Sequence, residues 1–339
     1  MKNEVRPDKN ERRLTIRWIR HHSMQPFSSE EDSAFLDRSG ITYGKSVFSS
    51  DVLLSHSLAS ARLRLLRHIF FWKKFLVWTN EPRFDTTPPA VKARNVRVMN
   101  VYSGDVFWHN LHFLGAYHNS YHVNLGIDIG AFPGRELSAH EVESRPRFCA
   151  AVFSYRDPGE SALYIDGQDV DLNARRQSLA LELYRRGLAD ISGKDWPSEV
   201  EIIENSGWGF SGSGHWWTRK LELLQQYRFN LCYENTVAPH YCTEKIWHAI
   251  AAGCLPIYYG KGTRIYDTFP RGSFIDGSEY ESNEALIEFL LGLSPAEHAL
   301  RYNQCLGAMR KACAAKAAKP DWRLEIIWRF ARKVRELCQ

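Results

Sequence analysis

A group of side chains suited to binding anions and hydroxyls lies where a predicted strand gives way to a helix. Residues 227–245 read Tyr-Arg-Phe-Asn-Leu-Cys-Tyr-Glu-Asn-Thr-Val-Ala-Pro-His-Tyr-Cys-Thr-Glu-Lys. The candidate side chains are Glu234, Asn235, Tyr241, Glu244 and Lys245. A helix N-terminus presents unpaired N–H groups and a positive dipole end, which suits phosphate. A carboxylate beside phosphate needs hydroxyl donors such as those of a ribose, so the pattern indicates nucleotide recognition.

A plainer interpretation of the same residues is a capped helix. Thr243 could cap a helix that begins at Glu244, with Glu244 on the helix dipole and the other charges in solvent. The spacing alone leaves both interpretations open.

The segment also resembles a known signature. With Lys220 upstream and Gly-Cys-Leu-Pro-Ile-Tyr-Tyr-Gly at 253–260 downstream, it is similar to the donor site of the α-1,3/4-fucosyltransferases, glycosyltransferase family 10. The family pattern runs Tyr-Lys-Phe, Glu-Asn-Ser/Thr and Tyr-x-Thr-Glu-Lys, and Arg228 stands where lysine is usual. The resemblance covers residues 145–280 well and 74–89 more weakly, and it is strongest to the soluble bacterial members.

This resemblance implies a GT-B fold, an α/β architecture of two Rossmann-like lobes whose parallel sheets face a central cleft. It implies an inverting transfer of L-fucose from GDP-fucose to a glycan hydroxyl, α-1,3 on GlcNAc or Glc, with no cofactor or metal required. The catalytic base it implies is Glu81. The donor-binding residues it implies are Arg176, Lys220, Glu234, Asn235, Tyr241, Glu244 and Lys245.

Several assignments keep an alternative. Glu81 follows a predicted strand and matches the family motif with a serine missing, so it could be a solvated loop glutamate. Arginine suits a diphosphate because its guanidinium group is permanently charged and can bind phosphate oxygens through two N–H groups. Arg175 could take this role instead of Arg176. Tyr241 could simply pack, and Glu234 and Asn235 could bond loop backbone.

Two other function classes also fit the residues. One is a GT-B transferase that uses another nucleotide sugar. The other is a catalytically silent carbohydrate- or membrane-binding protein.

Three further motifs point toward other chemistry, and each has a plainer interpretation. Asp169-Val-Asp171 resembles a metal-binding Asp-x-Asp, and solvated turn acids are favoured. Gly207–Gly212 fits Gly-x-Gly-x-x-Gly without the helix that a dinucleotide site needs. Two histidine pairs have zinc-like spacing in a region where packing is favoured: His109 with His112, and His118 with His122. No metal site is expected.

Composition sets the remaining limits. At 339 residues the chain can form two domains, and its net charge of +5 accompanies no recognised nucleic-acid module. No apolar run is long enough to span a membrane, and the N-terminus lacks the apolar core of a secretory signal. The seven cysteines contain no Cys-x-x-Cys pair, which favours reduced thiols. Together with the resemblance to the soluble bacterial members, these features lead us to expect a cytoplasmic bacterial protein, with peripheral contact to the inner membrane left open.

The elements that position these residues follow from periodicity. The N-terminal acceptor-side lobe is expected over 1–140, beginning with a partly loose polar arm over 1–60. The donor lobe is expected over 141–300, and a helical segment over 301–339. Strands are expected at 75–78, 95–101, 147–154, 200–203, 227–233, 254–259 and 273–275. Helices are expected at 173–186, 219–226 and 244–252, and from Ser294 onward.

The last expected helix is amphipathic. Ile327, Phe330, Val334 and Leu337 recur at helical spacing, while most basic residues lie off that stripe. The stripe could rest on an anionic membrane. It could instead pack back on the lobes, as the resemblance to GT-B proteins implies.

Overall fold

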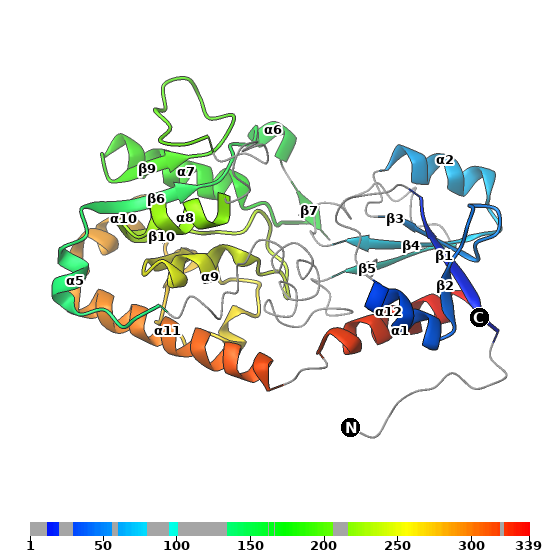
Figure 1. Ribbon diagram of the computed structural model, residues 1–339. Coiled ribbons are helices and arrows are strands. Elements are labelled where there is room, and N and C mark those ends of the chain that lie inside the picture. Colours follow the sequence, from blue (N-terminus) through cyan, green and yellow to red (C-terminus); the bar gives the residue numbers. More distant parts are fainter. Residues whose placement is uncertain are drawn as a thin grey trace. The chain divides into compact units, whose positions relative to one another are not determined.

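A computed structural model of the protein divides the chain into two units. The structure describes residues 12–19, 30–55, 60–79, 95–100, 134–161, 163–165, 167–205, 216–318 and 322–339. Unit 1 comprises residues 1–121 and 319–339, and unit 2 comprises residues 122–318 (Figure 1).

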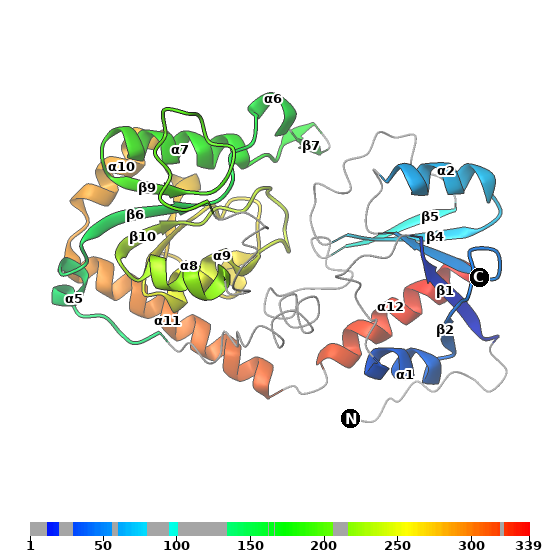
Figure 2. The same ribbon diagram turned by 45° about the horizontal axis from the view of Figure 1, so that its top comes forward.

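Unit 1 is built on a five-stranded sheet in which every pairing is parallel. Its strands are β1 Leu14–Trp18, β2 Ile41–Tyr43, β3 Val52–Ser55, β4 Lys74–Thr79 and β5 Val96–Asn100, in the order β2-β1-β3-β4-β5. Helices α1 Glu30–Arg38 and α12 Trp322–Cys338 cover one face, and α2 Ala61–Ile69 covers the other (Figures 1 and 2). Both faces are therefore buried, as parallel sheets require.

The N-terminal region corrects one expectation. Residues 12–19 and 30–55, expected to be part of a loose arm, form β1, α1, β2 and β3 instead. In β1 the alternate residues Leu14, Ile16 and Trp18 are buried. Strands of three to five residues give too little periodicity to detect alone, and neighbouring strands stabilise them. Residues 1–11 lie outside the described part of the chain.

Unit 2 repeats this arrangement. Its strands are β6 Arg147–Val152, β9 Ala189–Ser192, β10 Tyr227–Leu231, β11 Leu255–Tyr258 and β12 Ile275–Asp276, all parallel, in the order β12-β11-β10-β6-β9. Its helices include α5 Ala139–Glu143, α6 Pro158–Ser161, α7 Asn173–Arg185, α8 Trp216–Leu224, α9 Glu244–Ala251, α10 Asn283–Gly292 and α11 Pro295–Ala317. A short hairpin pairs β7 Tyr164–Ile165 with β8 Gln168–Asp169.

Both sheets share one strand order. Numbered along the chain within each sheet, the order is 2-1-3-4-5 in unit 1 and again in unit 2. In such doubly wound sheets ligands gather at the carboxyl ends of the first and third strands, where the connections diverge. Two α/β units of this kind confirm the expected fold class, and in unit 2 the switch point lies between β6 and β10.

Most predicted elements are confirmed to within a few residues. The strand expected at 200–203 is wrong, because only Ile202 forms a single bridge, to Ile191. Pro256 is the second residue of β11, where the β12 pairing begins only at Ile257. Gly253 ends α9 with a φ of +83°, as a glycine after a helix should.

The division of the chain differs from the expected one. Residues near 137 belong to unit 2 because Leu137 exchanges two hydrogen bonds with the Asn303 side chain of α11, at 2.9 and 3.0 Å. The expected segment 301–339 is also split. Helix α11 begins after Ser294, whose hydroxyl accepts the Glu297 N–H at 3.2 Å, and belongs to unit 2, whereas α12 belongs to unit 1.

The apolar stripe of α12 lies inside unit 1. Ile327, Phe330 and Val334 are fully buried, and the helix contacts α1 and β4. This burial favours packing over membrane contact for α12. Within the described ranges, no helix is long and apolar enough to cross a membrane.

Substitution at Phe330 tests the structural role of α12. Phe330→Ala removes a fully buried ring, so we expect a loss of about 3–5 kcal/mol in the free energy of unfolding. Urea unfolding followed by circular dichroism measures this loss. The control is Glu336→Ala on the exposed side of the same helix, whose ion pairs with Arg332 and Lys333 should contribute little. Equal stability of both variants would mean that α12 does not hold unit 1 together.

Candidate functional site

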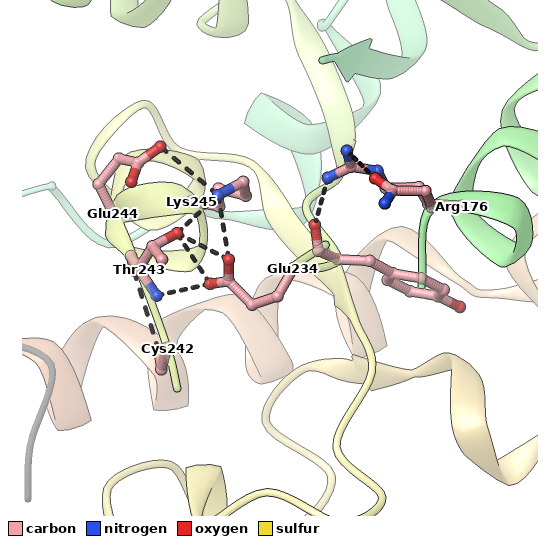
Figure 3. A network of polar contacts seen from close by, with 8 residues as sticks. Arg176, Glu234, Cys242, Thr243, Glu244 and Lys245 are labelled. Carbon is pink, nitrogen blue, oxygen red and sulfur yellow. Dashed lines mark hydrogen bonds and ion pairs between the residues drawn. The ribbon is translucent and has the colours of Figure 1, made fainter. Parts of the chain in front are cut away.

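The carboxylate of Glu234 is the centre of a buried polar network just beyond β10. Glu234 is 1% exposed. It accepts hydrogen bonds from the Thr243 N–H at 2.6 Å, the Thr243 hydroxyl at 2.7 and 2.9 Å, and Lys245 Nζ at 3.0 Å. Figure 3 shows the carboxylate directed at Thr243 and Lys245. These donors offset the cost of burying a charge.

The start of α9 is therefore not an ordinary capped helix. Thr243 precedes the helix, but its side chain makes no capping bond and serves Glu234 instead. Lys245 is largely buried, with 20% of its side chain exposed, and its Nζ also donates to the Thr243 hydroxyl at 2.7 Å. The interpretation that leaves these charges solvated is wrong.

Arg176 approaches the same strand end from α7. Its Nη2 donates to Asn173 Oδ1 at 2.5 Å, and its Nη1 lies 3.5 Å from the Tyr233 carbonyl. The guanidinium carbon is 4.5 Å from the centre of the Phe153 ring, just after β6. Arg176 thus lies at the switch point between β6 and β10. Tyr233 contacts Arg176 through its carbonyl, and the next residue, Glu234, contacts Lys245. Figure 3 shows Arg176, Glu234 and Lys245.

Asn173 is itself held by Asp171. The Asp171 carboxylate accepts the Asn173 backbone N–H at 2.9 Å and its side-chain amide at 3.1 Å. Asp171 is buried, so the expectation of a solvated turn acid is wrong there, although Asp169 is exposed. The described residues contain no cluster of three metal-ligating side chains.

Two loops at this sheet edge are also joined through their backbones. Leu172 N–H donates to the Asn235 carbonyl at 3.1 Å, and Val237 N–H donates to the Val170 carbonyl at 2.9 Å. The loop before α7 and the loop after β10 are thereby fixed in register. These bonds consequently fix Arg176 and Glu234 relative to each other at the carboxyl end of the unit 2 sheet.

The charges of the site act on one another. Burial by itself would lower the pKa of Lys245, but the charges of Glu234 and Glu244 outweigh burial and raise the pKa. Arg176 opposes that rise, so its positive charge acts on Lys245 as well. Lys220 of α8 is buried, and burial lowers its pKa despite the attraction of Glu244.

Glu244 responds in the opposite sense. Burial alone would raise the pKa of its carboxyl group, but the nearby Lys245 and Lys220 outweigh burial and lower the pKa. The side chain stays 16% exposed, and Lys245 Nζ lies 3.8 Å from Oε1. Glu244 is thus an ionised carboxylate with some access to solvent.

The structure brings most of the predicted donor-site residues together. The group consists of Arg176, Lys220, Glu234, Glu244 and Lys245. Tyr241 is 2% exposed and lies in the core, which favours its packing alternative. Arg175 is exposed, with its guanidinium carbon 5.9 Å from the centre of the Tyr259 ring. Asn235 is partly buried, and its carbonyl holds Leu172.

Other predicted residues lie outside the described part of the chain. They are Glu81, the glycine-rich segment 207–212, and the four histidines His109, His112, His118 and His122. Sequence reasoning missed Asn173 and Phe153. The Asp-x-Asn spacing before a helix start was the available signal for Asn173, and the sequence has none for Phe153.

Part of this site lies in a segment that is similar to a known protein family. The model described as "Glycosyltransferase family 10 (fucosyltransferase) C-term" matches residues 201–316, which include Lys220, Glu234 and Lys245. An α-(1,3)-fucosyltransferase of Helicobacter pylori is 32% identical over 93 residues, 27% of this chain and 19% of that protein. A 4-galactosyl-N-acetylglucosaminide 3-α-L-fucosyltransferase of Pongo pygmaeus is 31% identical over 112 residues, 31% of each protein. Residues 201–316 are thus similar to glycosyltransferase family 10, and the matches to these two relatives span less than a third of the relatives' length.

Solved structures show more distant similarity. A crystal structure of an α1,3-fucosyltransferase with GDP has a TM-score of 0.45 at 17% identity, covering 88% of this chain and 82% of that one. A DNA-modifying β-glucosyltransferase has a TM-score of 0.44 at 11% identity, covering 95% and 99%.

The depressed pKa of Glu244 predicts a pH-dependent stability. A carboxyl group whose folded pKa lies below its unfolded value of about 4.3 stabilises the fold above that value, and the stabilisation is lost as pH falls through the folded pKa. Glu244→Gln should therefore be less stable than wild type at pH 7, and the difference should shrink toward pH 3. Urea unfolding at pH 7, 5 and 3 measures the difference. The exposed Glu281→Gln serves as control, and a Glu244→Gln deficit that is constant with pH would refute the charge interaction.

Proposed function

We propose that this protein is an inverting fucosyltransferase that moves L-fucose from GDP-fucose to a hydroxyl of a glycan acceptor. The observation that carries the proposal is that Arg176 and Lys245 lie at the switch point of the unit 2 sheet, with Lys220 near enough for Glu244 and Lys245 to act on its pKa. Buried cations at that edge suit a nucleoside diphosphate. The family-model match over residues 201–316 and the names of the matched relatives support fucose as the transferred sugar.

The residues have distinct proposed roles. Arg176 and Lys245 bind the diphosphate and stabilise the charge that develops on it when GDP leaves. The Glu234 carboxylate is already engaged by Thr243 and Lys245, so its role is to hold Lys245 in position. Glu244 keeps partial exposure and can accept hydrogen bonds from ribose or fucose hydroxyls. Lys220 adds positive charge beside Glu244.

The proposed chemical step is a single displacement at the anomeric carbon. Glu81 accepts the proton of the acceptor hydroxyl, whose oxygen attacks from the face opposite the leaving GDP. The bond to GDP breaks as the new glycosidic bond forms, so the configuration inverts. Because Arg176 and Lys245 offset the leaving-group charge, the proposal requires no metal ion or cofactor.

The proposal also includes an acceptor sugar and a linkage. We propose an α-1,3 linkage to GlcNAc or Glc in a bacterial cytoplasm, which follows the resemblance to bacterial members. The main alternative is transfer from another nucleotide sugar, and the second is a homologue without activity. Turnover of GDP-fucose, measured beside UDP-glucose and GDP-mannose with a glycan panel, separates the three.

The diphosphate assignment is tested with two ligands. Arg176→Ala and Lys245→Ala each remove a charge-assisted contact worth roughly 1.5–3 kcal/mol, so GDP should bind about ten- to a hundred-fold more weakly. Guanosine lacks the diphosphate, and its affinity should stay unchanged in both variants. Isothermal titration calorimetry measures both ligands, and thermal melting verifies folding.

Arg175→Ala is the matched control for this test. It removes the same charge one residue away, and GDP affinity should change by less than threefold. A loss in Arg175→Ala with normal binding in Arg176→Ala would reverse the assignment. Equal loss of guanosine and GDP affinity would show that these residues do not act on the phosphates.

The proposed base is tested by Glu81→Gln. This substitution removes the proton acceptor at nearly constant size, so turnover should fall by about two to four orders of magnitude while GDP affinity is retained. Single-turnover assays with labelled GDP-fucose measure the chemical step, and calorimetry measures GDP affinity. Near-normal turnover would assign the base to another residue.

A further inference from the structure

Unit 1 carries an exposed apolar surface that the donor site does not use. Five large apolar residues are at least half exposed: Phe48 at 77%, Phe71 at 72%, Trp72 at 61%, Leu65 at 60% and Ile69 at 50%. They come from α2, from the turn that leads into β4, and from the loop between β2 and β3. Single exposed apolar residues are ordinary, but a group of this size marks an interaction surface.

The aromatic part of this surface is fixed in place. The ring of Phe70 lies 5.3 Å from that of Phe48 and 5.6 Å from that of Trp72, and Trp72 lies 5.1 Å from Phe71. Lys73 Nζ donates to the carbonyls of Phe48 and Ser50 at 2.8 and 2.6 Å, which ties the two turns together. The exposed rings are thus presented by a defined backbone.

Helix α2 continues the apolar surface and adds charge. Leu63 and Phe70 are buried against the unit 1 core, so the helix is anchored on that side. Leu65 and Ile69 are one turn apart on the exposed side, and Arg62, Arg64 and His68 are exposed around them. We name Phe48, Leu65, Ile69, Phe71 and Trp72, with Arg62 and Arg64, the aromatic–basic patch.

The charge around the patch is one-sided. Residues 45–79 contain six lysines and arginines and one acid, Asp51, which pairs with Arg12 at 2.5 Å. This stretch therefore carries a net charge of +5, equal to that of the whole chain. The rest of the chain is neutral in sum, so this stretch is more basic than the average of the chain.

We propose that the aromatic–basic patch docks unit 1 peripherally on an anionic lipid bilayer. Tryptophan and phenylalanine settle at the boundary between lipid headgroups and acyl chains, and nearby arginines are attracted to anionic headgroups. A second copy of this chain fits less well, because a two-fold dimer would place the patch, with its net positive charge, against itself. The bilayer complements both the apolar and the charged residues.

Vesicle binding tests the proposal. Wild-type protein should cosediment with vesicles containing one third phosphatidylglycerol in phosphatidylcholine, and much less with phosphatidylcholine alone. Leu65→Gln/Ile69→Gln and Arg62→Gln/Arg64→Gln should each bind at least tenfold more weakly. The wild-type affinity should fall as salt is raised from 50 to 500 mM, because counterions screen the arginines.

Matched controls come from unit 2. Leu291→Gln/Leu300→Gln removes two exposed leucines, and Arg185→Gln/Lys311→Gln removes two exposed charges; both should bind vesicles as wild type does. Thermal melting verifies folding, and calorimetry should show unchanged GDP affinity in every variant. The vesicle-binding result does not depend on the proposed transferase function. If the wild-type protein had no transferase activity, the expected vesicle binding would be the same.

Two outcomes would overturn the proposal. The first is absence of wild-type binding to anionic vesicles, or an equal loss in the unit 2 controls. The second is a wild-type dimer, measured by light scattering, that becomes a monomer in Leu65→Gln/Ile69→Gln, which would assign the patch to self-association.

Discussion

The burial of the Glu234 carboxylate is the constraint on which the geometry of the proposed donor site depends. A carboxylate at 1% exposure is tolerated only when its oxygens are satisfied, and Thr243 and Lys245 supply those partners. Because Thr243 opens α9, the same contacts fix where the helix begins relative to β10. They also restrain the long lysine side chain, whose rotamer freedom would otherwise oppose ligand binding. One buried acid thus joins a strand end, a helix start and a cation.

The strand order explains why this network forms where it does. In this 2-1-3-4-5 sheet the chain leaves β6 toward β9 and leaves β10 toward β11, in opposite directions, so the carboxyl ends of β6 and β10 border a region that neither connection crosses. Phe153 after β6 and Tyr233 after β10 contact Arg176 there. Backbone bonds between the loops at 170–172 and 235–237 then hold the edge together. The strand order thus determines where the polar network lies, and the backbone bonds between the loops fix the positions of its residues.

The sequence predicted some parts of the structure well and others poorly, and the difference has physical causes. Glu234, Glu244 and Lys245 lie within one continuous segment, between strand β10 and a glycine-terminated helix that leads into strand β11, so local pattern was sufficient for them. Strands β1, β2 and β3 of the unit 1 sheet were missed because they are short and depend on partners far along the chain. Asp171 was mistaken for a solvated acid because its burial comes from the tertiary contact at Thr236. No local pattern carries that information.

The charges at this site indicate why two cations that repel each other, Arg176 and Lys245, lie close together. Arg176 lowers the pKa of Lys245, so the two positive charges repel each other when no anion lies between them. Glu234 and Glu244 offset part of this repulsion from the protein side, and Asn173 and Phe153 keep Arg176 from moving away. An anion bound beside both cations would relieve what repulsion is left. Because folding has already brought these charges together, the diphosphate of the proposed donor would meet a preorganised environment in which little rearrangement opposes its binding or departure.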